Sequence, residues 1–340
     1  MVGILSFIMV IGLGLLVHEF GHFLAAKKCG VQVPEFAIGM GPALWTFKRG
    51  ETDYVLRLFP VGGYVAMAST LGGDPHPGCF ETKSKWQRAL ILLAGPVMNF
   101  TLAFVLVLSI GLFQGRPHAS NELAYVYPDM AASVAGLQVG DRIISYQGMA
   151  ITNGEELVAA IHRTQGEVNI ELIRDGERIE TVLVPDVIEH EGVPVSQVGL
   201  QMVIQRSFSL LYALEFGVQR LGNIFYQLFH SLEMLFITGE VGISDLSGPL
   251  GVYQMASMVA HQSIYAVLLL AALINVNLGL FNLFPLPALD GGKLVFIGLE
   301  ALFGKGVPQR LEAKIHMVGF FLFMSLFVFT FFNDLLRLRA

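Results

Sequence analysis

Residues 4–26 read ILSFIMVIGLGLLVHEFGHFLAA, an apolar stretch that carries His18, Glu19 and His22 near its end. About 20 consecutive apolar residues are enough for a helix to cross a bilayer. On a helix, residues four apart project from the same face, so His18 and His22 can bind one metal ion. Glu19 lies at the edge of that face, where it can accept a proton from water activated by the metal. The stretch therefore predicts a membrane-spanning helix that carries part of a metal site.

The composition of the whole chain agrees with a membrane location. Hydrophobic residues make up 54% of the 340 residues and charged residues only 14%, against about 25% charged residues in a typical soluble protein. This excludes disordered, collagen-like and ordinary soluble proteins. The net charge of −6 gives no basic surface for nucleic acid. Two cysteines are too few for a disulfide framework.

Three further stretches are long and apolar enough to span a membrane, at residues 90–113, 264–286 and 315–332. A fifth stretch, residues 207–237, mixes Glu, Gln, Arg and His with Leu, Phe and Tyr. That mixture favours an amphipathic helix lying at the membrane interface over a fifth span. We therefore predict a polytopic α-helical membrane protein with four transmembrane helices.

Positive charge predicts how the helices are oriented, because Lys and Arg are enriched in cytoplasmic loops. The loop between the first two spans and the loop between the last two are both basic. Both loops are therefore expected in the cytoplasm. The segment between residues 114 and 261, and both termini, are then expected on the far side. The basic residues concerned are Lys27, Lys28, Lys48, Arg49, Arg57, Lys83, Lys85 and Arg88 in the first loop, and Lys293, Lys305, Arg310 and Lys314 in the second.

Residues 119–190 have the pattern of a water-soluble α+β domain. An amphipathic stretch at 155–163 precedes two alternating segments at 167–173 and 178–184. Asp175-Gly176 lies between the two segments and is a strong hairpin signal. The pattern predicts a helix followed by a β-hairpin, inserted between the second and third spans.

Two histidines leave a catalytic zinc one protein ligand short. The next intramembrane acid to consider is Asp290, in the stretch NLFPLPALDGG at residues 282–292. Asp290 ends the third span beside cytoplasmic charges, and the two histidines lie at the cytoplasmic end of the first span. The two histidines and Asp290 are therefore expected at the same depth in the membrane.

Three asparagines in the predicted spans leave alternatives open. Asn277 and Asn282 could hold a peptide backbone or an oxyanion, or could form hydrogen bonds between helices. Asn99 could serve helix packing or belong to the active-site cavity. The remaining histidines have no ligand spacing and are expected to be surface or interface residues: His76, His118, His162, His190, His230, His261 and His316.

The HEFGH motif at residues 18–22, together with the motif Asn-x-x-Pro-x-Pro-x-Leu-Asp-Gly at 282–291, resembles the site-2 protease family of intramembrane zinc metalloproteases. The sequence is most similar to the bacterial branch of the sigma-E regulator protease RseP. The branch's sigma-E member has two PDZ domains in tandem, whereas this chain has room for one. Further matching stretches are Gly39-Met-Gly-Pro42, Pro60-Val-Gly-Gly-Tyr-Val65, Ala94-Gly-Pro-Val-Met-Asn99 and Leu246-Ser-Gly-Pro-Leu-Gly251.

The resemblance implies specific roles for the site residues. It implies Zn²⁺ bound by His18, His22 and Asp290, with Glu19 as the catalytic acid and base. It also implies that two asparagines, Asn277 and Asn282, contact or orient the substrate near the metal.

The resemblance also implies a domain organisation. Residues 1–113 and 264–340 would form the two halves of the protease core. Within the first half, region 34–88 would hold a membrane-re-entrant β-structure that pairs with an unwound substrate strand; its strand-like runs at 54–59 and 64–65 agree. Residues 119–190 would be an extracytoplasmic PDZ domain, and 207–237 the amphipathic segment that follows it.

We therefore expect an intramembrane zinc endopeptidase of the bacterial cytoplasmic membrane, with its active site towards the cytoplasm. The resemblance implies single-span membrane proteins as substrates, such as trimmed anti-sigma factors and remnant signal peptides, and a PDZ domain that contacts their extracytoplasmic segment. Two alternatives are a metal-ion transporter and a catalytically inactive PDZ scaffold. Intramembrane His and Asp often mark ion paths, but a transporter would favour inverted repeats, which are not visible in the sequence. A catalytically inactive relative would be expected to lose Glu19, which is present.

Overall fold

The computed structural model describes residues 2–70, 75–164, 166–190, 193–240, 242 and 247–337. Parts of five predicted regions lie outside these residues: residue 1 of 1–113, 71–74 of region 34–88, residue 165 of 119–190, Leu246 of the motif at 246–251, and 338–340 of 264–340. The chain forms two compact units. We call Met1–Ile110 with Ala213–Ala340 the helical unit, and Gly111–Tyr212 the sheet unit.

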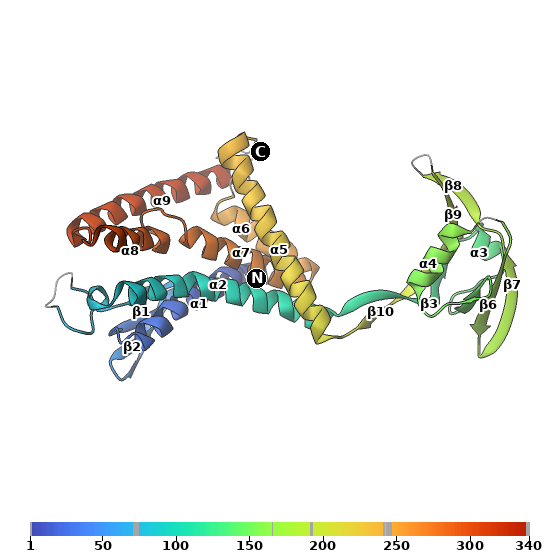
Figure 1. Ribbon diagram of the computed structural model, residues 1–340, viewed down its shortest axis with the longest axis horizontal. Helices are drawn as coiled ribbons and strands as arrows, with labels where there is room; N and C mark the ends of the chain where they lie inside the picture. Colours follow the sequence, from blue (N-terminus) through green and yellow to red (C-terminus); the bar gives the residue numbers. More distant parts are fainter. Residues whose placement is uncertain are drawn as a thin grey trace. The chain divides into compact units, whose positions relative to one another are not determined.

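Four described helices are long and apolar enough to cross a membrane, and each contains most or all of one predicted span. They are α1 (Val2–Lys28), α2 (Lys85–Gln114), α7 (Ile264–Asn282) and α9 (Gln309–Arg337) (Figure 1). Helix α7 ends four residues before the predicted end at residue 286. Pro285 explains this early end, because proline disfavours helical backbone in the residue before it.

Three shorter helices complete the helical unit: α5 (Leu210–Glu233), α6 (Pro249–Gln262) and α8 (Asp290–Phe303). Helix α5 continues into a π-helical turn at Met234–Thr238, so together they cover most of the predicted stretch 207–237. Ile224 of α5 is buried in a cluster with Ala103 and Val107 of α2 and Ala272 and Val276 of α7. The buried face of α5 therefore packs on two of the long helices.

The segment between α1 and α2 contains two strands, β1 (Glu35–Arg49) and β2 (Thr52–Ala66), followed by a short 3-10 helix at Phe80–Thr82. Residues 35–38 pair both with 53–56 and with 63–66. Both predicted strand-like runs, 54–59 and 64–65, lie in β2. The strands pack on the end of α1 through a cluster that includes Phe23, Val33, Phe36 and Ile91.

The sheet unit contains a sheet with the strand order β10-β3-β4-β6-β7, in which β5 pairs with β4. The hairpin predicted around Asp175-Gly176 is confirmed: β6 and β7 are antiparallel, and φ is +53° at Asp175 and +90° at Gly176. The predicted amphipathic helix is α4 (Gly154–Arg163). The unit extends beyond the predicted range 119–190, because β10 pairs with β3 and completes the sheet. The other elements are β3 (Arg116–Val126), α3 (Ala131–Val134), β4 (Arg142–Tyr146), β5 (Met149–Ala150), β6 (Val168–Arg174), β7 (Glu177–Leu183), β8 (Asp186–His190), β9 (Val193–Gln197) and β10 (Leu200–Ser207).

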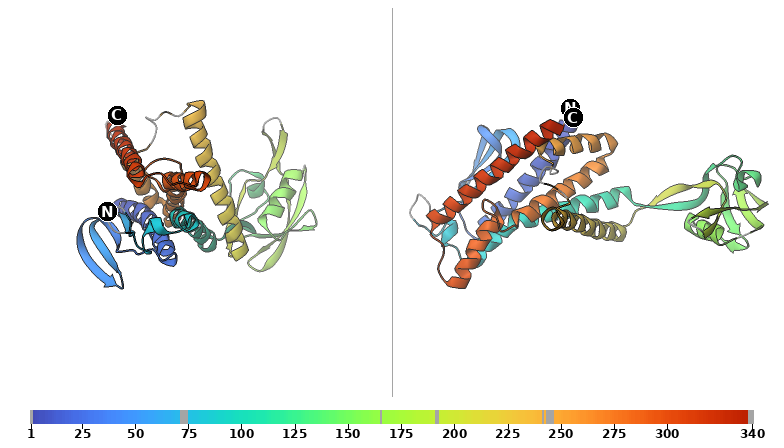
Figure 2. Two further views of the ribbon diagram at one scale, coloured as in Figure 1. Left: turned by 60° about the vertical axis from the view of Figure 1, so that its left-hand side comes forward. Right: turned by 90° about the horizontal axis from the view of Figure 1, so that it is seen from above.

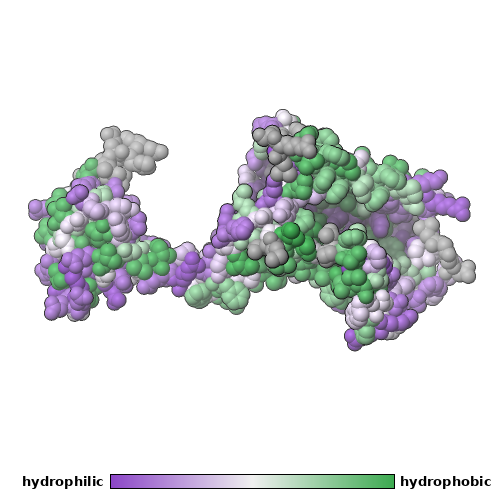
Figure 3. Space-filling view, turned by 180° about the vertical axis from the view of Figure 1, so that it is seen from behind, coloured by the Kyte–Doolittle hydropathy of each residue, from purple (hydrophilic) through white to green (hydrophobic). Residues whose placement is uncertain are grey.

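The two units differ in their cores and surfaces. The core of the sheet unit is a cluster of buried apolar side chains that includes Leu123, Ile143, Leu157 and Ile170. In the helical unit α1 contacts both α6 and α7, and Figure 2 shows these helices in two further views. Apolar residues cover much of the visible face of the helical unit, whereas polar residues are frequent on that of the sheet unit (Figure 3). An apolar outer surface is what lipid contact requires of the helical unit.

Candidate active site

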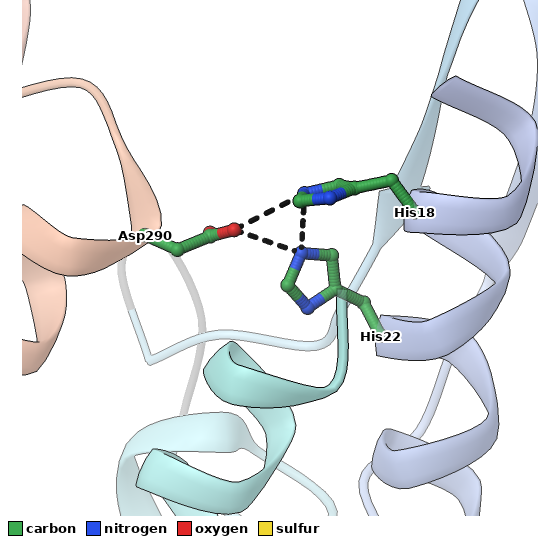
Figure 4. Close-up of side chains that lie close together, drawn as sticks. All are labelled: His18, His22 and Asp290. Atoms are coloured by element: carbon green, nitrogen blue, oxygen red, sulfur yellow. Dashed lines mark hydrogen bonds and ion pairs between the residues drawn. The ribbon is translucent and has the colours of Figure 1, made fainter. Parts of the chain in front are cut away.

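The structure brings together His18 and His22 of α1 with Asp290, the first residue of α8 (Figure 4). The two Nε2 atoms lie 3.1 Å apart, and each lies 3.1 Å from Oδ2 of Asp290. Both histidines are buried, with 5% and 6% of their surface exposed. The three predicted metal ligands therefore converge on one point, although 268 residues separate His22 from Asp290.

Glycines on α1 and α2 make this arrangement sterically possible. A Cβ atom at Gly95 would lie 2.4 Å from Nε2 of His22 and 2.8 Å from Cε1 of His18. A Cβ atom at Gly21 would lie 2.3 Å from the carbonyl oxygen of Ala94. The two helices therefore approach each other closely at the depth of the histidines because neither glycine has a side chain.

Hydrogen bonds orient both imidazole rings. His22 Nδ1 lies 2.7 Å from the carbonyl oxygen of Ile91, and it must donate to that oxygen. The neutral ring then leaves Nε2 unprotonated, as a metal ligand must be.

Asn99 is fully buried beside His18. Its Nδ2 lies 3.3 Å from His18 Nδ1, and its Oδ1 has no hydrogen-bond partner in the described part of the chain. Because metal binding at Nε2 leaves the proton on Nδ1, the amide fits the site best when it is turned over, with Oδ1 accepting from Nδ1. The sequence left open whether Asn99 serves helix packing or belongs to the active-site cavity. Its position beside His18 favours the active site.

The loop between α7 and α8 positions Asp290. Its turns bring the chain so close to the start of α8 that a Cβ atom at Gly291 would lie 2.3 Å from the carbonyl oxygen of Leu283. At Gly292 the corresponding distance to the oxygen of Leu286 would be 2.2 Å. The Asp-Gly-Gly sequence is therefore a packing requirement as well as a ligand motif.

The donor set fits zinc. In a tetrahedral site with bonds of 2.0–2.1 Å, neighbouring ligand atoms are about 3.3 Å apart, close to the 3.1 Å separations observed. Two imidazoles and one carboxylate also leave one position open, which is typical of catalytic rather than structural zinc.

Glu19 is not one of the three clustered ligand residues, but it lines the same cavity. This cavity has a volume of about 770 Å³. A Cβ atom added to Gly63 of β2 would lie 3.7 Å from Cγ of Glu19. Glu19 therefore shares the cavity with the three clustered residues and lies close to strand β2 at Gly63.

The two predicted substrate-positioning residues occupy different places. Asn282, the last residue of α7, lines the cavity. Asn277 lies on α7 and is not among the residues that line it. His316, which the sequence assigned to a surface or interface, lines the cavity together with the metal ligands. No local pattern marks His316, because its hydrogen-bond partner, Ala288, is 28 residues away.

A family model matches almost the whole chain. It is the model of peptidase family M50, and it matches residues 6–326, which include Glu19 and all three ligand residues. The chain belongs to peptidase family M50. The resemblance to site-2 proteases is thereby confirmed: the protein is a metalloprotease, and zinc is the metal of the family. Family membership favours the enzyme over the transporter and the inactive scaffold.

Several bacterial zinc metalloproteases are similar over their full length. The zinc metalloprotease RasP of Oceanobacillus iheyensis is 31% identical over 99% of this chain and 100% of that protein. RasP of Shouchella clausii is 31% identical over 98% of this chain and 99% of its own. The regulator of sigma-W protease RasP of Bacillus subtilis is 28% identical over 98% of both chains.

One similar solved structure covers a part of the chain. The PDZ domain of an SdrC-like protein from Listeria monocytogenes is 22% identical and covers 25% of this chain and 90% of that chain, with a TM-score of 0.22. A score this low does not establish a shared fold.

Proposed function

We propose that the chain is a zinc-dependent intramembrane endopeptidase that cleaves single-span membrane proteins. The observation that carries this proposal is the convergence of His18, His22 and Asp290 beside Glu19, on helices of a unit that can cross a membrane. Ionisable side chains are costly at membrane depth, so their assembly around one point indicates function.

The roles of the residues follow from their chemistry. His18, His22 and Asp290 would hold zinc, which would supply a Lewis acid for the attacking water and the scissile carbonyl. Glu19 accepts a proton from the attacking water and donates a proton to the leaving amine. Asn282, at the cavity wall, would donate hydrogen bonds to the substrate backbone. Asn277, which precedes it on α7, would help to orient the substrate.

The substrate must be unwound before it can be cut, because a helix keeps its carbonyl groups in hydrogen bonds. Strand β2 passes Glu19 at Gly63, and strands can bind an extended peptide by pairing with it. We therefore propose that the β1–β2 region, re-entrant in the membrane, holds the unwound substrate beside the metal site.

The sheet unit would contact the extracytoplasmic part of the substrate as a PDZ domain. Strand β10 is at one end of the strand order, and a cavity of about 410 Å³ lies between its start and α4, lined by Val158, Ile161, Leu200 and Met202 among others. An end strand beside a helix is the arrangement by which PDZ domains add a peptide to their sheet.

Substrate class and location follow from the relatives and the charges. The Bacillus subtilis relative is named a regulator of sigma-W protease, so anti-sigma factors are the leading substrate class for this chain, with remnant signal peptides as a second. We further propose that the enzyme resides in a bacterial cytoplasmic membrane, because the similar proteases are bacterial. The basic loops favour an orientation with the metal site towards the cytoplasm and the sheet unit outside.

Cleavage of a tagged single-span substrate by the purified chain tests the proposal. Glu19→Gln should lower the cleavage rate at least about 100-fold, because a positioned acid and base contributes that much or more. Its zinc content should stay native. Glu155→Gln changes an exposed residue of α4 in the same way and should cleave normally. Equal cleavage by the native chain and Glu19→Gln would refute the mechanism, and loss of zinc from Glu19→Gln would refute the assigned role of Glu19.

A further inference from the structure

Helix α9 holds the loop that precedes Asp290 at two points. A Cβ atom at Gly319 of α9 would lie 2.4 Å from Cβ of Pro287 and 2.7 Å from its carbonyl oxygen. His316 lies three residues earlier on the same helix, and its Nδ1 accepts a hydrogen bond of 2.8 Å from the backbone N–H of Ala288. The loop is therefore packed and hydrogen-bonded to α9 immediately before the metal ligand.

Ala288 needs such support because its backbone is strained. Its φ is +73°, in the left-handed region that residues with a Cβ atom rarely adopt. The other described non-glycine residues with positive φ, Asp129, Gln147 and Asp175, all belong to the sheet unit. Strain of this kind persists only where surrounding contacts impose it. At Ala288 the hydrogen bond to His316 is such a contact.

The position of Asp290 depends on this backbone. Asp290 comes two residues after Ala288, and its Oδ2 must reach both histidine Nε2 atoms, each 3.1 Å away. A rotation of the backbone at Ala288 would carry the carboxylate away from that point. The conformation of the loop therefore decides whether the third ligand is available.

His316 is itself held in place. Its ring contacts Phe296 of α8 edge to face, with 5.6 Å between the ring centroids. Because Nδ1 accepts a hydrogen bond, a neutral ring carries its proton on Nε2. That Nε2 is buried and has no hydrogen-bond partner in the described part of the chain; the nearest carboxylate oxygen, of Glu312, is 3.9 Å away. The hydrogen bond that the ring makes is thus the one to Ala288.

We infer that His316 is a positioning residue for the metal site: it holds the strained loop at Ala288 in the conformation that presents Asp290 to zinc. The inference rests on the proposed metal site. It assigns His316 no contact with the substrate or with the metal.

Two variants of similar size separate this role from general packing. In His316→Asn the amide oxygen can take the position of Nδ1 and still accept from Ala288. In His316→Gln the oxygen reaches the position of Nε2 and cannot do so. Zinc affinity of the purified full chain, measured by competition with a chelator, should fall about 10-fold or more in His316→Gln. It should stay close to native in His316→Asn and in Met317→Leu, a control at an exposed neighbour on α9.

Native zinc affinity in His316→Gln would overturn the inference, and so would equal losses in His316→Gln and His316→Asn. Asp290→Ala is measured in the same series to separate the two proposals. If Asp290→Ala binds zinc natively, the metal site itself is wrong. If Asp290→Ala loses zinc while His316→Gln keeps native affinity, only the role of His316 is wrong.

Discussion

Gly95 shows how a single residue without a side chain determines the site. His18 and His22 are the proposed zinc ligands, and their rings lie where a Cβ atom on α2 would otherwise project. The backbone of Gly95 has no positive φ that would require glycine. The requirement at Gly95 is therefore space for the metal ligands.

Gly95→Ala should abolish zinc binding. The new methyl group would lie 2.4 Å from the ligand atom Nε2 of His22, so the ring must move away from the metal position. Zinc content and cleavage should both fall to the level of Asp290→Ala, and α2 should remain helical by circular dichroism. Gly298→Ala is the matched control, because a Cβ atom at Gly298 of α8 would have no neighbour within 4 Å in the described part of the chain. Native zinc content in Gly95→Ala would contradict the geometry of the site.

Helix α6 depends on a residue from another helix. Its N-cap, Gly248, has no side chain to accept the free N–H groups of the first turn. Asp334 of α9 accepts from the N–H of Gly248 at 3.1 Å and from that of Gly251 at 2.9 Å. A carboxylate at a helix N-terminus is also favoured by the helix dipole. The end of α9 is therefore tied to the start of α6, which packs on α1.

Asp334→Ala should weaken the first turn of α6. Leaving buried N–H groups without an acceptor costs about 2 kcal/mol, so the amides of Gly248 and of residues 250–252 should exchange with deuterium much faster in the full chain; Pro249 has no amide hydrogen. Asp334→Asn keeps one amide oxygen as an acceptor and should show an intermediate effect. Identical exchange in the native chain and both variants would show that Asp334 does not cap α6.

At the scale of the whole molecule, the chain consists of two compact units with separate cores. The three proposed metal ligands and Glu19 all belong to the helical unit, and the sheet unit has its own core. Asp141 is fully buried in the sheet unit. Its carboxylate accepts hydrogen bonds from Nε and from one Nη atom of Arg174, both at 2.7 Å. The stability of the sheet unit can therefore be changed without touching the metal site.

Asp141→Ala should destabilise the sheet unit alone. The substitution removes two hydrogen bonds from the partly exposed Arg174 and one from the N–H of Gln138, which costs about 2 kcal/mol or more. Deuterium exchange of β4 and β6 in the full chain would detect such a loss. Zinc affinity should remain native. Arg178→Ala removes a more exposed pair with Glu171 and should cost less than about 1 kcal/mol. A loss of zinc from Asp141→Ala would show that the two units are coupled in stability.

Much of the fold could be predicted from local patterns. The four long helices follow from the length of the apolar stretches, and the hairpin of β6 and β7 follows from Asp175-Gly176. The helix α5 follows from the mixture of polar and apolar residues in its sequence. Patterns of this kind express the local preferences of the chain. The closing strand β10 and the short helices α6 and α8 were missed, because long-range pairing or packing defines them and the sequence shows no such neighbours.

For the site, the sequence by itself determined that His18 and His22 share one face of a helix, because residues four apart must do so on any helix. The sequence also singled out Glu19 at the edge of that face and Asp290 as the next intramembrane acid, and the family resemblance then implied their roles. Only the tertiary structure decided that Gly95 leaves room for the two rings, that Asn99 lies against His18, and that His316 holds the loop before Asp290. The physical reason is distance along the chain: these contacts join different helices, and only the packing of those helices brings the residues together.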